Sequence, residues 1–310
     1  MTQLMTRSGR PASPFCFGTM QYGGAADRTA SDALYRACRD ARINFFDTAY
    51  VYTEGRSEQF LGRQAADELD DVIIATKVAQ DQPSTKATVL SSFATSLDRL
   101  GMASVDLLYL HRFDDDTPLE SSMEGFAELK SQGKIRYIGV SNFAAWQVAK
   151  ACQVAAEFDL KIDVLQPMYN LVKRQAEVEI LPACMDYDVA VVPYSPLGGG
   201  LLTGKYAGGA GGRLLDNDMY KSRYNVAWMH EAAAKLPDLA QKYGTSATTL
   251  AVAWVAHNPS VAAPIISARS VEQLQPSLGA ASFEMTDAIY AEMCALSQTP
   301  APATDRLEEL

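Results

Sequence analysis

Histidine is scarce in this sequence. The 310 residues include three histidines, which lie far apart along the chain, and the acidic run Asp114-Asp115-Asp116 lacks the spacing of a metal-binding loop. Because catalytic metal sites are built from clustered histidine and carboxylate ligands, this pattern argues against a metal-dependent hydrolase and predicts that no metal is held. We expect the acidic run to be a solvated entry to a helix.

Paired cysteines, long apolar runs and an excess of positive charge are also missing. The five cysteines are odd in number and scattered, and no apolar run reaches the length that crosses a membrane. The first residues contain no apolar stretch of the secretory kind. A formal net charge of −10 does not suit binding to nucleic acid or an anionic membrane. These absences predict a cytoplasmic protein with reduced thiols, no nucleic-acid partner and no membrane partner.

The glycine fingerprint G-x-G-x-x-G does not occur between the first expected strand and its helix. Its absence weakens the interpretation as an open, doubly wound sheet that binds a dinucleotide. The hydrophobic fraction of 48% and the charged fraction of 21% are ordinary for a globular chain. A chain of 310 residues suits one large barrel or two ordinary domains.

The most informative stretch covers residues 45–62 and has the sequence FFDTAYVYTEGRSEQFLG. A short apolar strand ends on Asp47, a loop with two tyrosines follows, and Ser57 is expected to cap the next helix with its hydroxyl. Two later apolar strands end on Lys77 and on His111. An acid, a phenol, an amine and an imidazole near successive strand ends are the components of a proton-transfer site.

Strand-like and helix-like segments alternate along the whole chain. Runs typical of strands lie at 14–17, 43–47, 72–77, 105–111, 135–140, 164–169, 189–194 and 262–266. Helices are expected at 30–41, from 57, at 86–100, 119–131, 144–158, 175–187, 227–243 (interrupted near Pro237), 246–257, 271–281 and 286–297. This alternation implies parallel strands, and eight units predict an α/β fold, a (β/α)8 TIM barrel with an N-terminal hairpin over 3–13 and extra C-terminal helices. We expect one domain, residues 1–310, with the open doubly wound sheet as the alternative.

Strand ends meet at one mouth of a barrel, so Asp47, Lys77 and His111 are expected to be neighbours. Each residue alone has an ordinary explanation. A single buried tyrosine or histidine is usually a satisfied core group, and an aspartate with a lysine is usually a structural ion pair. The joint pattern is what favours a catalytic site.

The motifs around these residues resemble those of the aldo-keto reductase superfamily, over nearly the whole chain. The similar segments are FDTAYVY at 46–52, GRSE at 55–58, IATK at 74–77, DLLYLH at 106–111, GKIRYIGVSNF at 133–143, QPMYN at 166–170 and YSPLG at 194–198. The resemblance implies NAD(P)(H)-dependent interconversion of an aldehyde or ketone and the corresponding alcohol. The implied catalytic tetrad is Asp47, Tyr52, Lys77 and His111. Tyr52 rather than Tyr50 is the general acid/base, because it lies five residues after the aspartate as the family pattern requires.

The chemistry of these groups fits proton transfer to a carbonyl oxygen. A free phenol has a pKa of about 10, which is too high for efficient acid catalysis at neutral pH, and a nearby Lys77 would lower the pKa of Tyr52. Asp47 would pair with Lys77 and hold it charged. His111 would either bond the carbonyl oxygen or share a proton with Tyr52, and the sequence leaves both roles open.

The resemblance also implies a cofactor site spread over several loops. Ser141, Asn142 and Gln166 would lie near the nicotinamide carboxamide, and Tyr194 would stack on the nicotinamide ring. The other implied contacts are Gly18, Thr19, Met20, Ser195, Pro196, Leu197, Gly198, Leu202, Gly204, Lys205, Ile266, Ser267, Ala268, Arg269, Gln273 and Ser277. The chain departs from many relatives at Ser267, where they have glycine, and at Pro276 and Ser277, where they have glutamate and asparagine.

Arg269 determines which cofactor is expected. It is placed to hold an adenosine 2′-phosphate by bidentate hydrogen bonds, and the N-terminus of the following helix would add N–H donors. NADP(H) is therefore favoured over NAD(H). A solvated surface arginine is the alternative.

The substrate is expected to be a small carbonyl compound or alcohol. Large side chains that would line its pocket are Tyr22, Tyr50, Phe113 and Trp228, although ordinary packing accounts for them equally well. The long excursion at 199–225 is expected to cover the cofactor or the substrate. We expect a monomer or a small homo-oligomer.

A second function fits the same motifs. The potassium-channel β-subunits are similar in fold and retain the tetrad, yet act chiefly through a partner. A cofactor-binding regulatory subunit of that type is therefore the alternative to an NADP-dependent carbonyl reductase. A stable tetramer on a membrane protein, with negligible turnover of aldehydes, would favour it.

Overall fold

The computed structural model describes residues 2–208, 214, 217–304, 306 and 308. The strands are β1 (Cys16–Gly18), β2 (Phe45–Asp47), β3 (Ile73–Val78), β4 (Leu107–Leu110), β5 (Tyr137–Ser141), β6 (Val164–Gln166), β7 (Ala190–Val191) and β8 (Ile265–Ile266). The α-helices are α1 (Arg28–Asp40), α2 (Arg56–Ala65), α3 (Lys86–Leu100), α4 (Leu119–Ser131), α5 (Ala145–Ala156), α6 (Ile180–Asp186), α8 (Asp218–Arg223), α9 (Ala227–Lys242), α10 (Ala247–His257), α11 (Val271–Leu278) and α12 (Asp287–Cys294). Short 3-10 turns are η1 (Tyr52–Gly55), η2 (Gln175–Glu177), η3 (Gly198–Thr203), η4 (Lys205–Gly208) and η5 (Gly279–Ala281).

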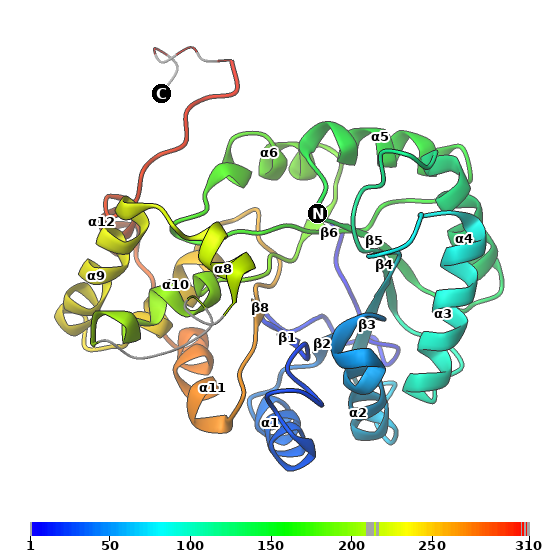
Figure 1. Ribbon diagram of the computed structural model, residues 1–310, viewed down its shortest axis with the longest axis horizontal. Helices are drawn as coiled ribbons and strands as arrows, with labels where there is room; N and C mark the ends of the chain where they lie inside the picture. The colour runs from blue at the N-terminus through cyan, green and yellow to red at the C-terminus, as the bar shows by residue number, and fades with distance from the viewer. Residues whose placement is uncertain (1, 209–213, 215–216, 305, 307, 309–310) are drawn as a thin grey trace.

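The strands form a single parallel sheet whose order follows the chain. Within the described ranges, eight strands pair in the order β7-β6-β5-β4-β3-β2-β1-β8. The sheet curls, as Figure 1 shows. The N–H groups of Ala262 and Ile265 donate to the carbonyls of Val191 and Pro193, each at 2.8 Å. The strand order has no reversal of the kind that defines a doubly wound sheet, so that alternative is wrong and the arrangement is consistent with a (β/α)8 fold.

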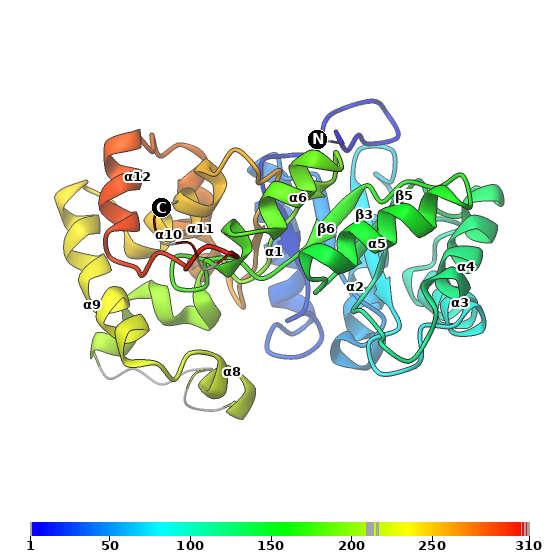
Figure 2. The same ribbon diagram turned by 90° about the horizontal axis from the view of Figure 1, so that it is seen from above.

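Two apolar layers hold the sheet, because successive residues of a strand point to opposite faces. Phe45 and Ile73 pack with the inner layer, whereas Phe46 and Ile74 pack with the outer layer of strand and helix side chains. All four side chains are fully or almost fully buried, and each contributes roughly 1.5–3 kcal/mol. Figures 1 and 2 show helices α1 to α5 on the outside of the strands, and α9 to α12 gathered on the side of β8.

Several predicted helices are confirmed with their bounds, notably those at 86–100 and 119–131. The ends of α3 have clear local causes. The Thr85 hydroxyl accepts from the N–H of Thr88 at the start, and Gly101 ends the helix in the left-handed region with φ of 65°.

The predicted cap at Ser57 is wrong. Helix α2 begins at Arg56, after Gly55, which has φ of 89° and supplies the turn into the helix. The Ser57 hydroxyl is buried and donates to the carbonyl oxygen of Thr19 at 2.8 Å. Its N–H donates to the hydroxyl of Thr53 at 3.0 Å. The Ser57 side chain therefore joins the segment after β1 to the start of α2 instead of capping that helix.

Other element bounds also differ from the prediction. Helix α9 continues through Pro237, because burial of Leu236 and Ala240 on its inner face outweighs the local cost of about 3 kcal/mol. The helix expected over 175–187 is divided into η2 and α6. The predicted N-terminal hairpin stays a prediction: the structure has one antiparallel bridge there, between Met5 and Pro11. Within the expected excursion, residues 209–213 and 215–216 lie outside the described part of the chain.

Candidate active site

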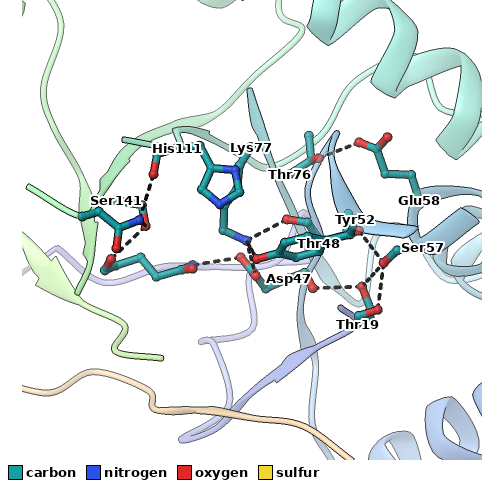
Figure 3. A network of polar contacts seen from close by, with 12 residues as sticks. Thr19, Asp47, Thr48, Tyr52, Ser57, Glu58, Thr76, Lys77, His111 and Ser141 are labelled. Carbon is teal, nitrogen blue, oxygen red and sulfur yellow. Dashed lines mark hydrogen bonds and ion pairs between the residues drawn. The ribbon is translucent and has the colours of Figure 1, made fainter. Parts of the chain in front are cut away.

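Three neighbouring strands bring the predicted acid, amine and imidazole to one edge of the sheet. Asp47 is the last residue of β2, Lys77 is next to last in β3, and His111 directly follows β4. Parallel strands place their carboxyl ends at the same edge. Figure 3 shows the side chains of Asp47, Lys77 and His111 close together with that of Tyr52, which lies at the start of η1.

The ammonium of Lys77 has an oxygen partner for each of its three N–H bonds. It donates to the carboxylate of Asp47, to the carbonyl of Thr48 at 2.8 Å and to the phenol oxygen of Tyr52 at 3.4 Å. Asp47 and Lys77 have exposed fractions of 2% and 0%. A buried charge without a partner costs several kcal/mol, so this pairing is what allows both groups to be charged in the interior.

Burial and Lys77 act in opposite directions on the acidity of Tyr52. Burial raises the pKa of Tyr52 and outweighs Lys77, which lowers it, so the pKa lies above its ordinary value of 10. Burial lowers the pKa of Lys77, but Asp47 and Tyr52 together raise it above 10.5. The effect that the sequence predicted for Lys77 on the pKa of Tyr52 is present. At neutral pH Tyr52 is a protonated phenol beside a charged lysine.

His111 is a neutral imidazole that faces Tyr52. Burial, aided by the charge of Lys77, lowers the pKa of His111 to about 3. Its ring meets that of Tyr52 edge-on, with centroids 5.9 Å apart and an interplanar angle of 81°. The Nδ1 atom is buried and has no hydrogen-bond partner among the described residues.

The residues expected beside the nicotinamide carboxamide are already bonded to the tetrad. Gln166 donates to the second oxygen of Asp47 at 3.0 Å, and Ser141 donates to the Gln166 carbonyl at 2.9 Å. The Asn142 amide donates to the His111 carbonyl at 3.0 Å. The Tyr194 hydroxyl donates to the amide oxygen of Asn142 at 2.7 Å. One network therefore links the ends of β4, β5 and β6 and the segment after β7.

A cavity of about 600 Å³ opens over this network. Asp47, Tyr52 and His111 line it, while Lys77 lies buried beneath. The predicted cofactor residues that line the cavity are Gly18, Met20, Ser141, Asn142, Gln166, Tyr194, Ser195, Pro196, Leu197, Lys205, Ile266, Ser267, Ala268, Arg269 and Gln273. The structure thus brings most of the predicted site to one surface.

The remaining cofactor predictions do not line the cavity. The Thr19 hydroxyl is buried and donates to the Asp47 carbonyl at 3.0 Å. Gly198, Leu202 and Ser277 are buried, and Gly204 packs beside Pro237. These positions shape the backbone or the core around the cavity instead of facing it.

None of the four predicted substrate-pocket residues lines the cavity. Tyr22 is fully buried and packs against Phe17, with ring centroids 5.9 Å apart. Tyr50 lies against the guanidinium of Arg99 at 4.5 Å. The two others also pack against protein: Phe113 meets Phe143 and Trp146 edge-on, and Trp228 lies against the core. Packing, the alternative that the sequence left open, accounts for all four.

The cavity also has lining residues that the sequence did not single out: Gln21, Val51, Gln80, Gly199, Gly200, Thr203, Met219, Tyr220, Arg223, Thr248 and Ile265. Gln21 and Val51 adjoin predicted residues, so proximity in sequence was a usable signal. Met219, Tyr220 and Arg223 belong to the short helix α8, inside the excursion for which no conformation could be derived.

The residues around the cavity are compatible with a nicotinamide dinucleotide. Ser195, Gly199 and Gly200 have φ of 60°, 66° and 97°, so this glycine-rich loop adopts backbone conformations that few side chains tolerate. Lys205 and Arg269 contribute positive charge to the lining of a chain whose net charge is −10. In the described ranges no carboxylate forms an ion pair with Arg269.

Among the residues whose positions are described, no group of three or more histidine, cysteine, aspartate and glutamate side chains is arranged to hold a metal ion. No helix in the same part of the chain combines the length and apolar character needed to cross a membrane.

The chain is similar to known oxidoreductases along most of its length. Residues 14–298 match the model of the Aldo/keto reductase family. Aflatoxin B1 aldehyde reductase member 2 of Rattus norvegicus is 36% identical, over 88% of this chain and 81% of its own. The uncharacterized oxidoreductase YrpG of Bacillus subtilis is 34% identical, over 90% of each chain. A probable voltage-gated potassium channel subunit beta of Oryza sativa is 35% identical, over 88% and 89%.

Proposed function

The chain belongs to the aldo/keto reductase family and is an oxidoreductase, and we propose that it uses NADP(H) to interconvert an aldehyde or ketone and the corresponding alcohol. The observation that carries the proposal is the contact of one ammonium, that of Lys77, with Asp47 and with the phenol of Tyr52 at the floor of the cavity. This arrangement supplies an acid beside a space for a carbonyl.

In this account the tetrad is Asp47, Tyr52, Lys77 and His111. When bound, the nicotinamide supplies the hydride. Tyr52 donates its proton to the carbonyl oxygen during reduction and accepts it during oxidation. The charge of Lys77 stabilises the phenolate that remains, and Asp47 holds Lys77 charged and in place. The phenol is partly exposed to the cavity, so the proton has a path to the substrate.

The neutral state of His111 supports one of the two roles that the sequence left open. An imidazole with a pKa of about 3 does not carry an extra proton at neutral pH. His111 therefore orients the carbonyl oxygen by a hydrogen bond rather than sharing a proton with Tyr52.

NADP(H) is proposed as the cofactor over NAD(H). Arg269 and Lys205 would hold its phosphates, Ser141, Asn142 and Gln166 its carboxamide, and Tyr194 would pack on the nicotinamide ring. The N-terminus of α11, which begins just after Arg269 and is capped by Ser270, adds N–H donors.

Titration of the protein with NADPH and NADH, followed by its fluorescence, tests this proposal. We expect tight binding of NADPH and weaker binding of NADH. Preference for NADH would remove the 2′-phosphate role from Arg269, and binding of neither would contradict the proposed use of a nicotinamide cofactor.

We also propose the architecture, the substrate class and the oligomeric state of the protein. We expect a single domain over 1–310 that forms a closed (β/α)8 barrel, with an N-terminal hairpin and extra C-terminal helices. A small carbonyl compound or alcohol is the proposed substrate, and a monomer or small homo-oligomer the proposed state. The five cysteines are free, which supports a reducing compartment such as the cytoplasm.

The regulatory alternative has one specific observation in its favour. Relatives from Oryza sativa and Arabidopsis thaliana, 35% and 33% identical, are named as probable voltage-gated potassium channel subunits beta. A stable complex with a membrane protein, together with negligible turnover on a broad panel of aldehydes, would favour this function. Turnover of aldehydes with NADPH by the isolated chain favours the reductase.

A further inference from the structure

We propose that Arg99 is a positioning residue for the reaction, because it fixes the loop that carries Tyr52. The inference rests on the role proposed above for Tyr52 as the acid. Arg99 does not line the cavity and touches neither the acid nor its lysine. It acts through the backbone of residues 50–55.

Arg99 makes three contacts from the last turn of α3. Its guanidinium donates to the carbonyl oxygen of Tyr50 at 2.7 Å and to the carboxylate of Glu58 at 3.2 Å. The carbon of the guanidinium lies 4.5 Å from the centre of the Tyr50 ring. Tyr50 precedes Tyr52 by two residues, so the carbonyl that Arg99 holds is close to the acid along the chain.

Glu58 connects this contact to the strand of the catalytic lysine. It has an exposed fraction of 0%, and Thr76, the residue before Lys77, donates to its second carboxylate oxygen at 2.7 Å. Figure 3 shows the Thr76–Glu58 pair beside the tetrad. The N–H of Tyr50 also donates to the carbonyl of Lys77 at 3.0 Å. Arg99 and Glu58 therefore fix the Tyr52 loop relative to β3.

The backbone after Tyr52 needs such support. Thr53, Glu54 and Gly55 have φ of 46°, 58° and 89°, three successive residues in the left-handed region. This conformation costs free energy for residues other than glycine, and it persists only where surrounding contacts determine it. Arg99 packs directly on the turn: a Cβ atom on Gly55 would lie 2.5 Å from its Nε atom. The arginine thus holds the acid in a conformation that the loop alone does not favour.

Truncation of Arg99 has two separable consequences. Arg99→Met frees the Tyr50 carbonyl, and it also leaves Glu58 buried without its cation, which lowers stability whatever the role of the loop. The double variant Arg99→Met/Glu58→Gln removes the buried charge but does not restore the bond to Tyr50. Stability and loop position are therefore tested apart.

The experiment measures kcat, KM for NADPH, Tm and amide hydrogen exchange over residues 48–56. In both variants we expect kcat to fall ~10–100-fold, as a small displacement of a reacting group does, with KM for NADPH unchanged and faster exchange over 48–56. We expect Tm to recover in the double variant while kcat does not. Arg63→Met is the matched control. Arg63 pairs with Asp32 at a distance of 2.8 Å, and this pair lies away from the loop. The control should change neither kcat nor this exchange.

Recovery of kcat together with Tm in the double variant would overturn the proposal, because Arg99 would then be only structural. Wild-type exchange over 48–56 in Arg99→Met would overturn it as well. If Arg99→Met does not fold, the double variant and Arg99→Lys, which retains a charge for Glu58 without the guanidinium fork, give the same readouts. Absence of turnover in the wild-type protein would instead contradict the proposed function, and the exchange measurement would still test the effect of Arg99 on the loop.

Discussion

The ammonium of Lys77 lies 3.4 Å from the phenol oxygen of Tyr52 and 4.9 Å from the centre of the Tyr52 ring. It also pairs with Asp47, whose other carboxylate oxygen accepts from Gln166. The charge of Lys77 is therefore shared between Tyr52, the proposed acid, and Asp47, which keeps Lys77 charged.

Lys77→Met removes that shared cation. We expect kcat to fall by about 10²–10⁴, because the phenolate loses its stabilising charge. Stability should fall by about 3–5 kcal/mol, because the carboxylate of Asp47 remains buried without a cation. Urea unfolding and steady-state kinetics measure both effects.

The variant Lys77→Met/Asp47→Asn distinguishes these effects. Its stability should return toward that of the wild type, while its kcat stays low. A catalytic group is expected to account for a loss of about 10²–10⁴ in kcat. Turnover within about threefold of the wild type in either variant would therefore show that Lys77 does not take part in proton transfer.

His111 makes the stability of the protein depend on pH. Its pKa is lowered from 6.5 to about 3, first by burial and then by Lys77. Between pH 6.5 and pH 3 the unfolded chain binds a proton at His111 that the folded chain does not bind. The stability contributed by this difference is therefore present above pH 6.5 and is lost as the pH falls toward 3. The full effect is roughly 5 kcal/mol.

Replacement by an uncharged side chain tests this dependence. In His111→Gln the free energy of unfolding should change less steeply with pH between pH 6 and pH 4. The slope should differ from that of the wild type by the equivalent of close to one bound proton. The slope is measured by urea unfolding at several pH values. Equal slopes in variant and wild type would show that His111 takes up its proton in the folded protein as readily as in the unfolded chain.

Arg269→Gln tests the cofactor preference. The side chain is exposed at the cavity lining, directly before the N-cap of α11. Loss of a charged partner for the 2′-phosphate should weaken NADPH binding about 10–100-fold, because charge-assisted bidentate hydrogen bonds are among the strongest in proteins. Binding of NADH should be unchanged. The same substitution at Arg42, which is exposed and does not line the cavity, is the control. Equal losses for both cofactors would contradict a specific role in 2′-phosphate binding.

The ring of Tyr109 in β4 leaves no room for a side chain at Gly139 in β5. A Cβ atom at position 139 would lie 2.3 Å from Cδ1 of Tyr109. Gly139→Ala should therefore destabilise the fold by about 1–3 kcal/mol, as overpacking of a core does. The double variant Gly139→Ala/Tyr109→Leu should recover part of that loss, because the smaller side chain makes room for the methyl group. Additive losses in urea unfolding would show that the two positions do not compete for space.

The sequence predicted that the four residues of the proposed tetrad lie together, because two independent rules agree there. Motif spacing selected Asp47, Tyr52, Lys77 and His111, and parallel strands must place the ends of β2, β3 and β4 at one edge. The same reasoning worked for Ser141 and Gln166, since both end a strand. Positions at strand ends are fixed by the sheet, so they can be read from the pattern of strands.

Loop residues could not be predicted in the same way. Tyr22 and Tyr50 are aromatic residues in loops, but whether such a ring faces a cavity or packs on its neighbours depends on contacts distant in sequence. Arg223 lines the cavity from α8, a helix of six residues in a polar segment without apolar periodicity. The net acidity of Tyr52 could not be predicted for a related reason, because the sequence names the neighbouring charge but not the depth of burial.

Turnover of an aldehyde by Tyr52→Phe, measured together with the Kd for NADPH, tests the central claim most directly. The substitution keeps the ring beside Lys77 and removes only the proton donor. We predict that kcat falls about 10²–10⁴-fold while the Kd for NADPH is unchanged. Near-normal turnover with intact cofactor binding would show that Tyr52 is not the acid.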